Sequence, residues 1–175
     1  GMLSAGARVP ALFGERFFSR YQEAVRYGAV YESSELEILD AFQALKIPAV
    51  ILESAAVRRL YPLAETAANS PLRLFIPEEK YPLARGYLVD LGYERDDFYK
   101  GFGERMKRIG GFQVEIYHSL PFFTKGYKNC MKGLLDRAFP DKNRPVLKSL
   151  SLESSYLFRL AEAAYHFCTD SLKVR

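Results

Sequence analysis

The chain has 175 residues, 49% of them hydrophobic and 26% charged, which suits one globular domain, with or without a helical appendage, around a buried core. Lys and Arg outnumber Asp and Glu by only 25 to 21, a net charge of +4 that is too small and too interspersed to predict nucleic-acid binding. The two cysteines lack the spacing of a zinc site or a disulfide framework, and no apolar run approaches the roughly 20 residues of a membrane span, so we expect a cytoplasmic protein that contacts no membrane.

The N-terminal part of the chain predicts two helices after a flexible lead-in over residues 1–14. Over residues 15–27, apolar residues at helical spacing predict an amphipathic helix whose aromatic side chains pack inward, among them Phe17, Phe18 and Tyr21. Ser34 and Glu37 have the spacing of a capping box, so we expect a second helix to begin there and to end before Pro48.

The segment 47–77 organises the centre of the chain. It predicts a buried strand over 49–52, a turn at Glu53 and Ser54, a short helix that Pro62 closes, and a second strand over 72–76. A strand, turn, helix and strand often hold a nucleotide at one edge of a sheet, because the turn and the helix N-terminus present backbone N–H groups to phosphate.

A third helix and a hairpin follow the second strand. Residues 77–91 predict a helix that Gly92 ends, and this order of elements implies a partly parallel or mixed sheet. Residues 94–103 are expected to form a loop or an irregular strand. The arms 104–109 and 112–118 flank Gly110 and Gly111, which predict a two-residue hairpin turn.

Alternation in the second arm of this hairpin places Glu115 on its polar face. Gln113, Glu115 and Tyr117 point to one side of the strand, and Val114 and Ile116 point to the other.

The C-terminal part is predicted to be helical, over 128–138 and over 152–168, with a polar connector bounded by prolines between them. In the last helix, an apolar stripe that includes Leu157, Leu160 and Ala161 is expected to lie opposite Arg159 and Glu162. The resulting division is a lead-in over 1–14, an α/β domain over 15–122 and a helical subdomain over 123–175. Because the last helix lacks a stop signal, we expect either that the natural fold extends beyond Arg175 or that this helix frays at its end.

Five short motifs in this order resemble a known family. They are LKIPAVIL, Leu60-Tyr61-Pro62, Leu74-Phe75-Ile76-Pro77, Leu91-Gly92-Tyr93 and Val114-Glu115-Ile116-Tyr117-His118. Their order and spacing resemble the uncharacterised nucleotidyltransferase-like proteins related to the polymerase-β superfamily, over roughly residues 35–170. The resemblance implies an α+β fold, with a mixed sheet flanked by helices and a helical C-terminal portion.

The resemblance also implies a metal-dependent site. In that superfamily a turn after the first strand holds the triphosphate, an Asp-x-Asp on the next strand binds magnesium, and a third carboxylate helps to activate the attacking hydroxyl. Glu115 matches this third carboxylate. The chemistry requires oxygen ligands for two Mg²⁺ ions about 4 Å apart, which neutralise the phosphates and the leaving group.

The sequence departs from this pattern at the ligands. Glu53 and Ser54 stand where relatives carry lysine and glycine, and Pro71 and Arg73 stand where the two aspartates should be. An arginine of the family falls on Ala67. A guanidinium about 4 Å from a divalent cation, at an effective dielectric constant near 20, is opposed by roughly 8 kcal/mol. Arg73 therefore disfavours the metal ion that an aspartate would bind.

We interpret the chain as a degenerate nucleotidyltransferase-like protein that acts as a binding or regulatory module, with no cofactor expected and an unidentified protein partner. Glu115 is then a salt-bridged residue, paired with Arg73, rather than a catalytic base.

Two alternatives stay open. An active enzyme would use Mg²⁺ and an NTP, with Glu115 as a catalytic residue and with misaligned carboxylates such as Glu65, Glu78 or Glu79 as ligands. A metal-independent module would instead bind a nucleotide or small anion through Arg73 and the turn at Ser54, next to Glu53 and Tyr117.

Overall fold

The computed structural model of the chain describes residues 11–54, 71–99, 101–110, 112–120 and 125–173, which form four helices and seven strands. The helices are α1 (Ala11–Ala44), α2 (Tyr81–Asp90), α3 (Lys125–Asp136) and α4 (Leu152–Lys173). The strands are β1 (Ala49–Glu53), β2 (Leu72–Phe75), β3 (Glu94–Tyr99), β4 (Gly103–Lys107), β5 (Gln113–Tyr117), β6 (Phe139–Pro140) and β7 (Leu147–Ser149).

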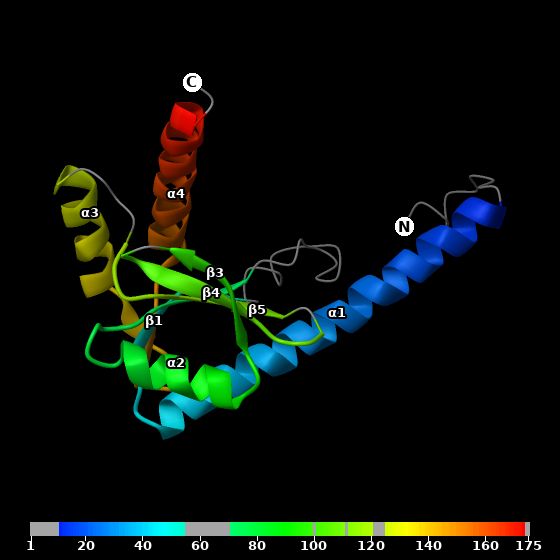
Figure 1. Cartoon of the computed structure of the whole chain (residues 1–175), viewed down its shortest axis with the longest axis horizontal. Coiled ribbons are helices and arrows are strands. Elements are labelled where there is room, and N and C mark those ends of the chain that lie inside the picture. The colour runs from blue at the N-terminus through cyan, green and yellow to red at the C-terminus, as the bar shows by residue number, and fades with distance from the viewer. Residues whose placement is uncertain (1–10, 55–70, 100, 111, 121–124, 174–175) are drawn as a thin grey trace.

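All seven strands belong to one mixed sheet in the order β3-β4-β5-β2-β1-β7-β6. β2 runs parallel to β5 and β1 runs parallel to β7, while the other neighbouring pairs are antiparallel. Helices α1 and α2 lie on one side of the sheet, and α3 and α4 lie on the other (Figure 1). The predicted mixed sheet flanked by helices is therefore confirmed.

Each face of the sheet has its own core. The larger core joins α1 and α2 to the sheet and includes Phe42, Leu74, Leu88 and Ile116, all of which have no exposed surface. The smaller core joins α3 and α4 to the opposite face and includes Leu52, Leu134 and Phe158. Because strand side chains alternate between the faces, β2 contributes Leu72 and Leu74 to the larger core and turns Arg73 and Phe75 toward α4.

The N-terminal prediction of two helices is wrong, because α1 is a single helix that begins inside the predicted lead-in and continues past Ser34. The proposed capping box instead binds the hairpin: Arg108 donates to Ser34 Oγ at 3.0 Å and to Glu37 Oε2 at 2.8 Å. The outer part of α1 extends beyond the sheet (Figure 1). Its aromatic residues do not pack inward as predicted, since Phe17 and Phe18 are 62% and 60% exposed.

Two local irregularities decide which residues face one another in the sheet. A bulge between Ile51 and Glu53 brings Glu53, rather than Leu52, opposite Arg73. The predicted hairpin is confirmed, but it closes with a longer turn than the glycine pair implies: Arg108 N donates to Phe112 O, and Gly110 has φ +104.

Other predicted elements need smaller corrections. Residues 94–99 form strand β3, whose pairing with β4 has an irregularity between Arg95 and Asp97, so the irregular strand expected there is confirmed. The predicted polar connector contains β6, after which β7 follows. Over residues 152–164 of α4 the buried residues are Phe158 and Ala161. Ala161 is buried as predicted, whereas the predicted stripe residues Leu157 and Leu160 are 46% and 49% exposed. The helix that Pro62 should close lies outside the described residues, and the division of the chain at residue 122 stays a prediction.

Within the described ranges, no helix is long and apolar enough to cross a membrane.

Candidate functional site

The candidate site is centred on Arg73 in the middle of the sheet. Arg73 lies on β2, between β1 and β5, and its side chain is only 15% exposed. Its Nε donates to Glu115 Oε2 at 2.7 Å, and its Nη1 donates to both carboxylate oxygens of Glu162 at 2.7 Å. The same Nη1 lies 3.4 Å from Glu53 Oε2. One guanidinium thus joins three carboxylates from β1, β5 and α4, which we call the Arg73 cluster.

Glu115 is the most deeply buried acid of the Arg73 cluster, at 1% exposure. Its second oxygen accepts a 2.9 Å hydrogen bond from Arg105 Nε, and Oε2 also accepts one of 2.7 Å from the Tyr117 hydroxyl. Burial alone would raise the pKa of Glu115, but the charge of Arg73 and the hydrogen bond from Tyr117 outweigh it and hold this pKa below its usual range. Glu115 is therefore ionised at neutral pH and its oxygens are engaged.

Arg73 is held in its charged form by the same contacts. Burial alone would lower the pKa of Arg73, but the negative charges of Glu115 and Glu162 raise it above the ordinary value of an arginine. A charge that is buried this far needs paired partners, because an uncompensated ion in the interior costs several kcal/mol. The three carboxylates supply that compensation.

Helix α4 contributes two residues that the sequence analysis placed on the helix face away from the core. Arg159 forms ion pairs with Glu53 Oε1 and, at 3.0 Å, with Glu162 Oε2. The only sign of this pair in the sequence is its spacing, because an arginine and a glutamate three residues apart lie on the same face of a helix. In the structure this face also carries the buried residues Phe158 and Ala161. This face meets the sheet, so Arg159 and Glu162 belong to the Arg73 cluster.

The sequence-predicted site residues are brought together in large part. Glu53, Arg73, Glu115 and Tyr117 all lie on the α4 side of the sheet within this network of contacts. Ser54 follows Glu53 directly and is partly buried, and the helix expected after it lies outside the described residues.

Two of the alternative metal ligands, Glu78 and Glu79, do not belong to the network. Glu78 and Glu79 are exposed in the turn before α2, and Glu65 lies in the undescribed stretch 55–70. The carboxylates that do gather around Arg73, namely Glu53 and Glu162 with Glu115, are different ones.

The donor set does not fit a magnesium ion with Arg73 in this position. Magnesium needs oxygen ligands in near-octahedral geometry at about 2.1 Å. The three carboxylates point at a guanidinium instead, and in the part of the chain that the structure describes no group of three or more His, Cys, Asp or Glu is arranged to hold a metal. A buried oxygen, Glu53 Oε2, has an ion pair with Arg73 but no hydrogen bond.

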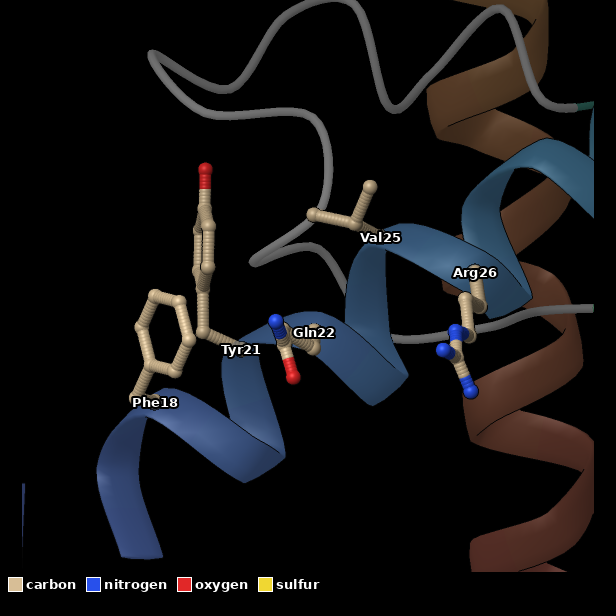
Figure 2. A pocket seen from close by; sticks show the side chains of 5 residues that line it. All are labelled: Phe18, Tyr21, Gln22, Val25 and Arg26. Carbon is tan, nitrogen blue, oxygen red and sulfur yellow. The ribbon is translucent and has the colours of Figure 1, made fainter. Parts of the chain in front are cut away.

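A separate hollow of about 330 Å³ lies on the outer part of α1. Figure 2 shows the described residues that line it, Phe18, Tyr21, Gln22, Val25 and Arg26, which come from this helix. None of these five residues belongs to the Arg73 cluster, and none of them carries a carboxylate. These five side chains carry no chemistry of the kind that the cluster offers.

Comparison with known proteins identifies the family. A search of curated proteins and a search of solved structures each gave no match. A family model described as uncharacterised nucleotidyltransferase matches residues 3–175, nearly the whole chain, which confirms the resemblance carried by the five motifs. The chain therefore belongs to this uncharacterised nucleotidyltransferase family.

Proposed function

We propose that this protein is a nucleotidyltransferase-like binding or regulatory module in which metal-dependent nucleotidyl transfer has been lost. The observation that carries the proposal is the position of Arg73, whose guanidinium lies between Glu53, Glu115 and Glu162. In the family pattern this position belongs to an aspartate that binds magnesium. A fixed internal cation takes over the charge that the metal ion would supply.

The contacts of Glu115 support the same proposal. As the counterpart of the third carboxylate, Glu115 would have to face a metal ion or an attacking hydroxyl. Both of its oxygens instead accept hydrogen bonds from the side chains of Arg73, Arg105 and Tyr117. A carboxylate with a lowered pKa and three donors is a weak general base, since each donor stabilises the ionised form.

One observation favours the active-enzyme alternative. Three carboxylates do converge, although two of them, Glu53 and Glu162, are not the ones that the family pattern supplies. If Arg73 turned away, this set would offer oxygen ligands to Mg²⁺. The alternative requires a buried arginine to leave three partners at once, and we therefore rank it second.

The partners and the location of the protein are part of the proposal. We propose a cytoplasmic protein that binds a nucleotide or small anion and an unidentified protein partner, without a cofactor of its own. If the enzyme alternative holds, Mg²⁺ and an NTP are required.

Thermal unfolding with and without Mg²⁺ and a non-hydrolysable NTP tests the proposal. The wild-type protein should show no rise in Tm that depends on Mg²⁺. The double variant Pro71→Asp/Arg73→Asp restores two oxygen ligands and removes the cation, so it should gain such a rise, by about 5 to 10 °C at 100 times Kd.

The matched control is Pro71→Asp alone, which adds a carboxylate while Arg73 stays in place. We expect no metal-dependent shift from it. A metal-dependent shift in the wild-type protein, or NTP turnover that disappears in Glu115→Gln, would contradict the proposal and support the active enzyme. The wild-type measurement decides the question even if the double variant fails to fold.

A further inference from the structure

We propose that α4 is an electrostatic latch on the Arg73 cluster: Glu162 occupies Arg73 as an internal anion, and a phosphate chain that takes its place releases the helix. The inference rests on the proposed function, because it assigns a regulation to the same binding site. The ligand class is a polyphosphate, either free or as part of a nucleotide.

The latch consists of two side chains on one face of α4. Glu162 accepts from Arg73 Nη1 with both oxygens at 2.7 Å, and Arg159 reaches Glu53 at the end of β1. Arg159 and Glu162 also pair with each other at 3.0 Å. Two strands of the sheet and one helix are therefore joined by a single chain of charges.

Over residues 152–164, where the side chains of α4 are described, the helix buries few apolar residues against the rest of the protein. Between residues 152 and 164 only Phe158 and Ala161 are buried. The larger apolar side chains of this stretch are between 46% and 69% exposed, and they are Leu152, Tyr156, Leu157 and Leu160. Helix α4 also points away from the sheet toward its C-terminal end (Figure 1). A change in the charged contacts can therefore shift the balance between a bound and a released helix.

The charges of the cluster explain why the competitor should be an anion. Three arginines face three glutamates and balance them, and these six residues are Arg73, Arg105, Arg159, Glu53, Glu115 and Glu162. Release of α4 takes Arg159 away together with Glu162, so the remaining charges stay balanced, but the Nη1 of Arg73 loses its carboxylate acceptor and becomes an open cationic donor. Arginine binds phosphate oxygens through the same N–H groups that hold a carboxylate, so a phosphate chain can replace Glu162 without a change in the donors.

Amide hydrogen exchange of α4 tests the latch first without any ligand. Glu162→Gln should speed the exchange of amides in residues 156–164 by about tenfold, because it removes the negative charge and one of the two oxygens that accept from Arg73. In the wild-type protein, about 1 M NaCl should produce part of the same increase by screening.

The matched control is Glu153→Gln, the same substitution at an exposed carboxylate of the same helix. Glu153 lies in the first turn of α4, where the helix N-terminus and Ser151 are its partners. It has no part in the Arg73 cluster, so the amides of residues 156–164, which begin beyond this first turn, should exchange at the wild-type rate.

Tripolyphosphate tests the competition. It should speed α4 exchange in the wild-type protein, and by calorimetry it should bind Glu162→Gln about tenfold more tightly than Glu153→Gln. The same measurement with ATP in the absence of metal identifies the source of the phosphate chain. Equal affinities of ATP and tripolyphosphate would mean that the site recognises the phosphate chain alone, and tighter binding of ATP would mean that it also contacts the nucleoside.

Equal α4 exchange in the two variants would overturn the latch. So would tripolyphosphate that leaves α4 protected or that does not prefer Glu162→Gln. The ligand-free exchange is independent of metal, so a failure of the latch is distinguishable from the Mg²⁺-dependent stabilisation that would contradict the proposed function.

Discussion

Two buried glutamates on neighbouring strands, Glu104 on β4 and Glu115 on β5, have the same kinds of partner on opposite faces of the sheet. Each is 1% exposed, and each is bound by two arginines and a tyrosine hydroxyl. The partners of Glu104 are Tyr81, Arg85 and Arg95, and those of Glu115 are Tyr117, Arg73 and Arg105. Judged only by these direct contacts, either glutamate would be a candidate for a functional site.

The two glutamates differ in how exposed their arginines are and in which other acids those arginines contact. Arg85 and Arg95 are 39% and 48% exposed, so the charges around Glu104 reach solvent. Arg105 is also 33% exposed, but Arg73 is only 15% exposed and continues to Glu53 and Glu162, so the charges around Glu115 continue into a partly buried network that includes α4. On the Glu104 face, a carboxylate with two arginines therefore has a structural role. The other face is a candidate site only because Glu53 and Glu162 also contact Arg73.

The largest expected loss of stability comes from replacing one arginine on each face of the sheet. Arg73→Met leaves Glu53 and Glu115 buried without their shared cation and should lower the free energy of unfolding by about 3 kcal/mol. Arg85→Met leaves Glu104 paired with Arg95 near solvent and should cost about 1 kcal/mol. Urea denaturation of both variants measures the difference, and equal losses would mean that the two faces are energetically alike.

A smaller effect is expected from the two tyrosines. Tyr117→Phe removes a 2.7 Å hydrogen bond to a buried carboxylate and should cost about 1.5 kcal/mol. The bond from Tyr81 to Glu104 is longer, 3.2 Å, so Tyr81→Phe should cost less than about 1 kcal/mol. Denaturation midpoints at constant m-value give both numbers. A larger loss of unfolding free energy for Tyr81→Phe than for Tyr117→Phe would contradict the expectation that the contacts of Glu115 contribute more to stability than those of Glu104.

The smallest effect concerns pH. Because the folded-state pKa of Glu115 is lowered, its ionisation stabilises the fold above the ordinary value of 4.5, and this contribution is lost as pH falls through the lowered pKa. The free energy of unfolding of Glu115→Gln, measured between pH 7 and pH 3, should therefore fall less steeply than that of the wild-type protein. Parallel pH profiles would show that Glu115 has the same pKa in both states.

The pairing of Arg73 with Glu115 could be predicted from the sequence because both residues lie in short strands with clear alternation. The register between the strands then brings them opposite each other. The resemblance to the family led to the same pairing, since it implies that positions 73 and 115 share one site. The contribution of Arg159 and Glu162 could not be predicted, because the apolar pattern of α4 points to Leu157 and Leu160 as the buried residues and they are exposed.

By itself, the sequence determined the succession of the central strands and the hairpin along the chain, the family, and the presence of Pro71 and Arg73 where the resemblance leads us to expect two aspartates. These follow from local patterns and from residue identity at single positions. Beyond the pair of Arg73 and Glu115, only the tertiary structure decided which charges meet.

The bulge in β1 brings Glu53 opposite Arg73, and the turn at Gly110 brings Arg105 opposite Glu115, where a two-residue turn would have placed Met106. A shift of one residue moves a strand side chain to the other face of the sheet. The composition of the Arg73 cluster therefore depends on irregularities that alternation does not encode.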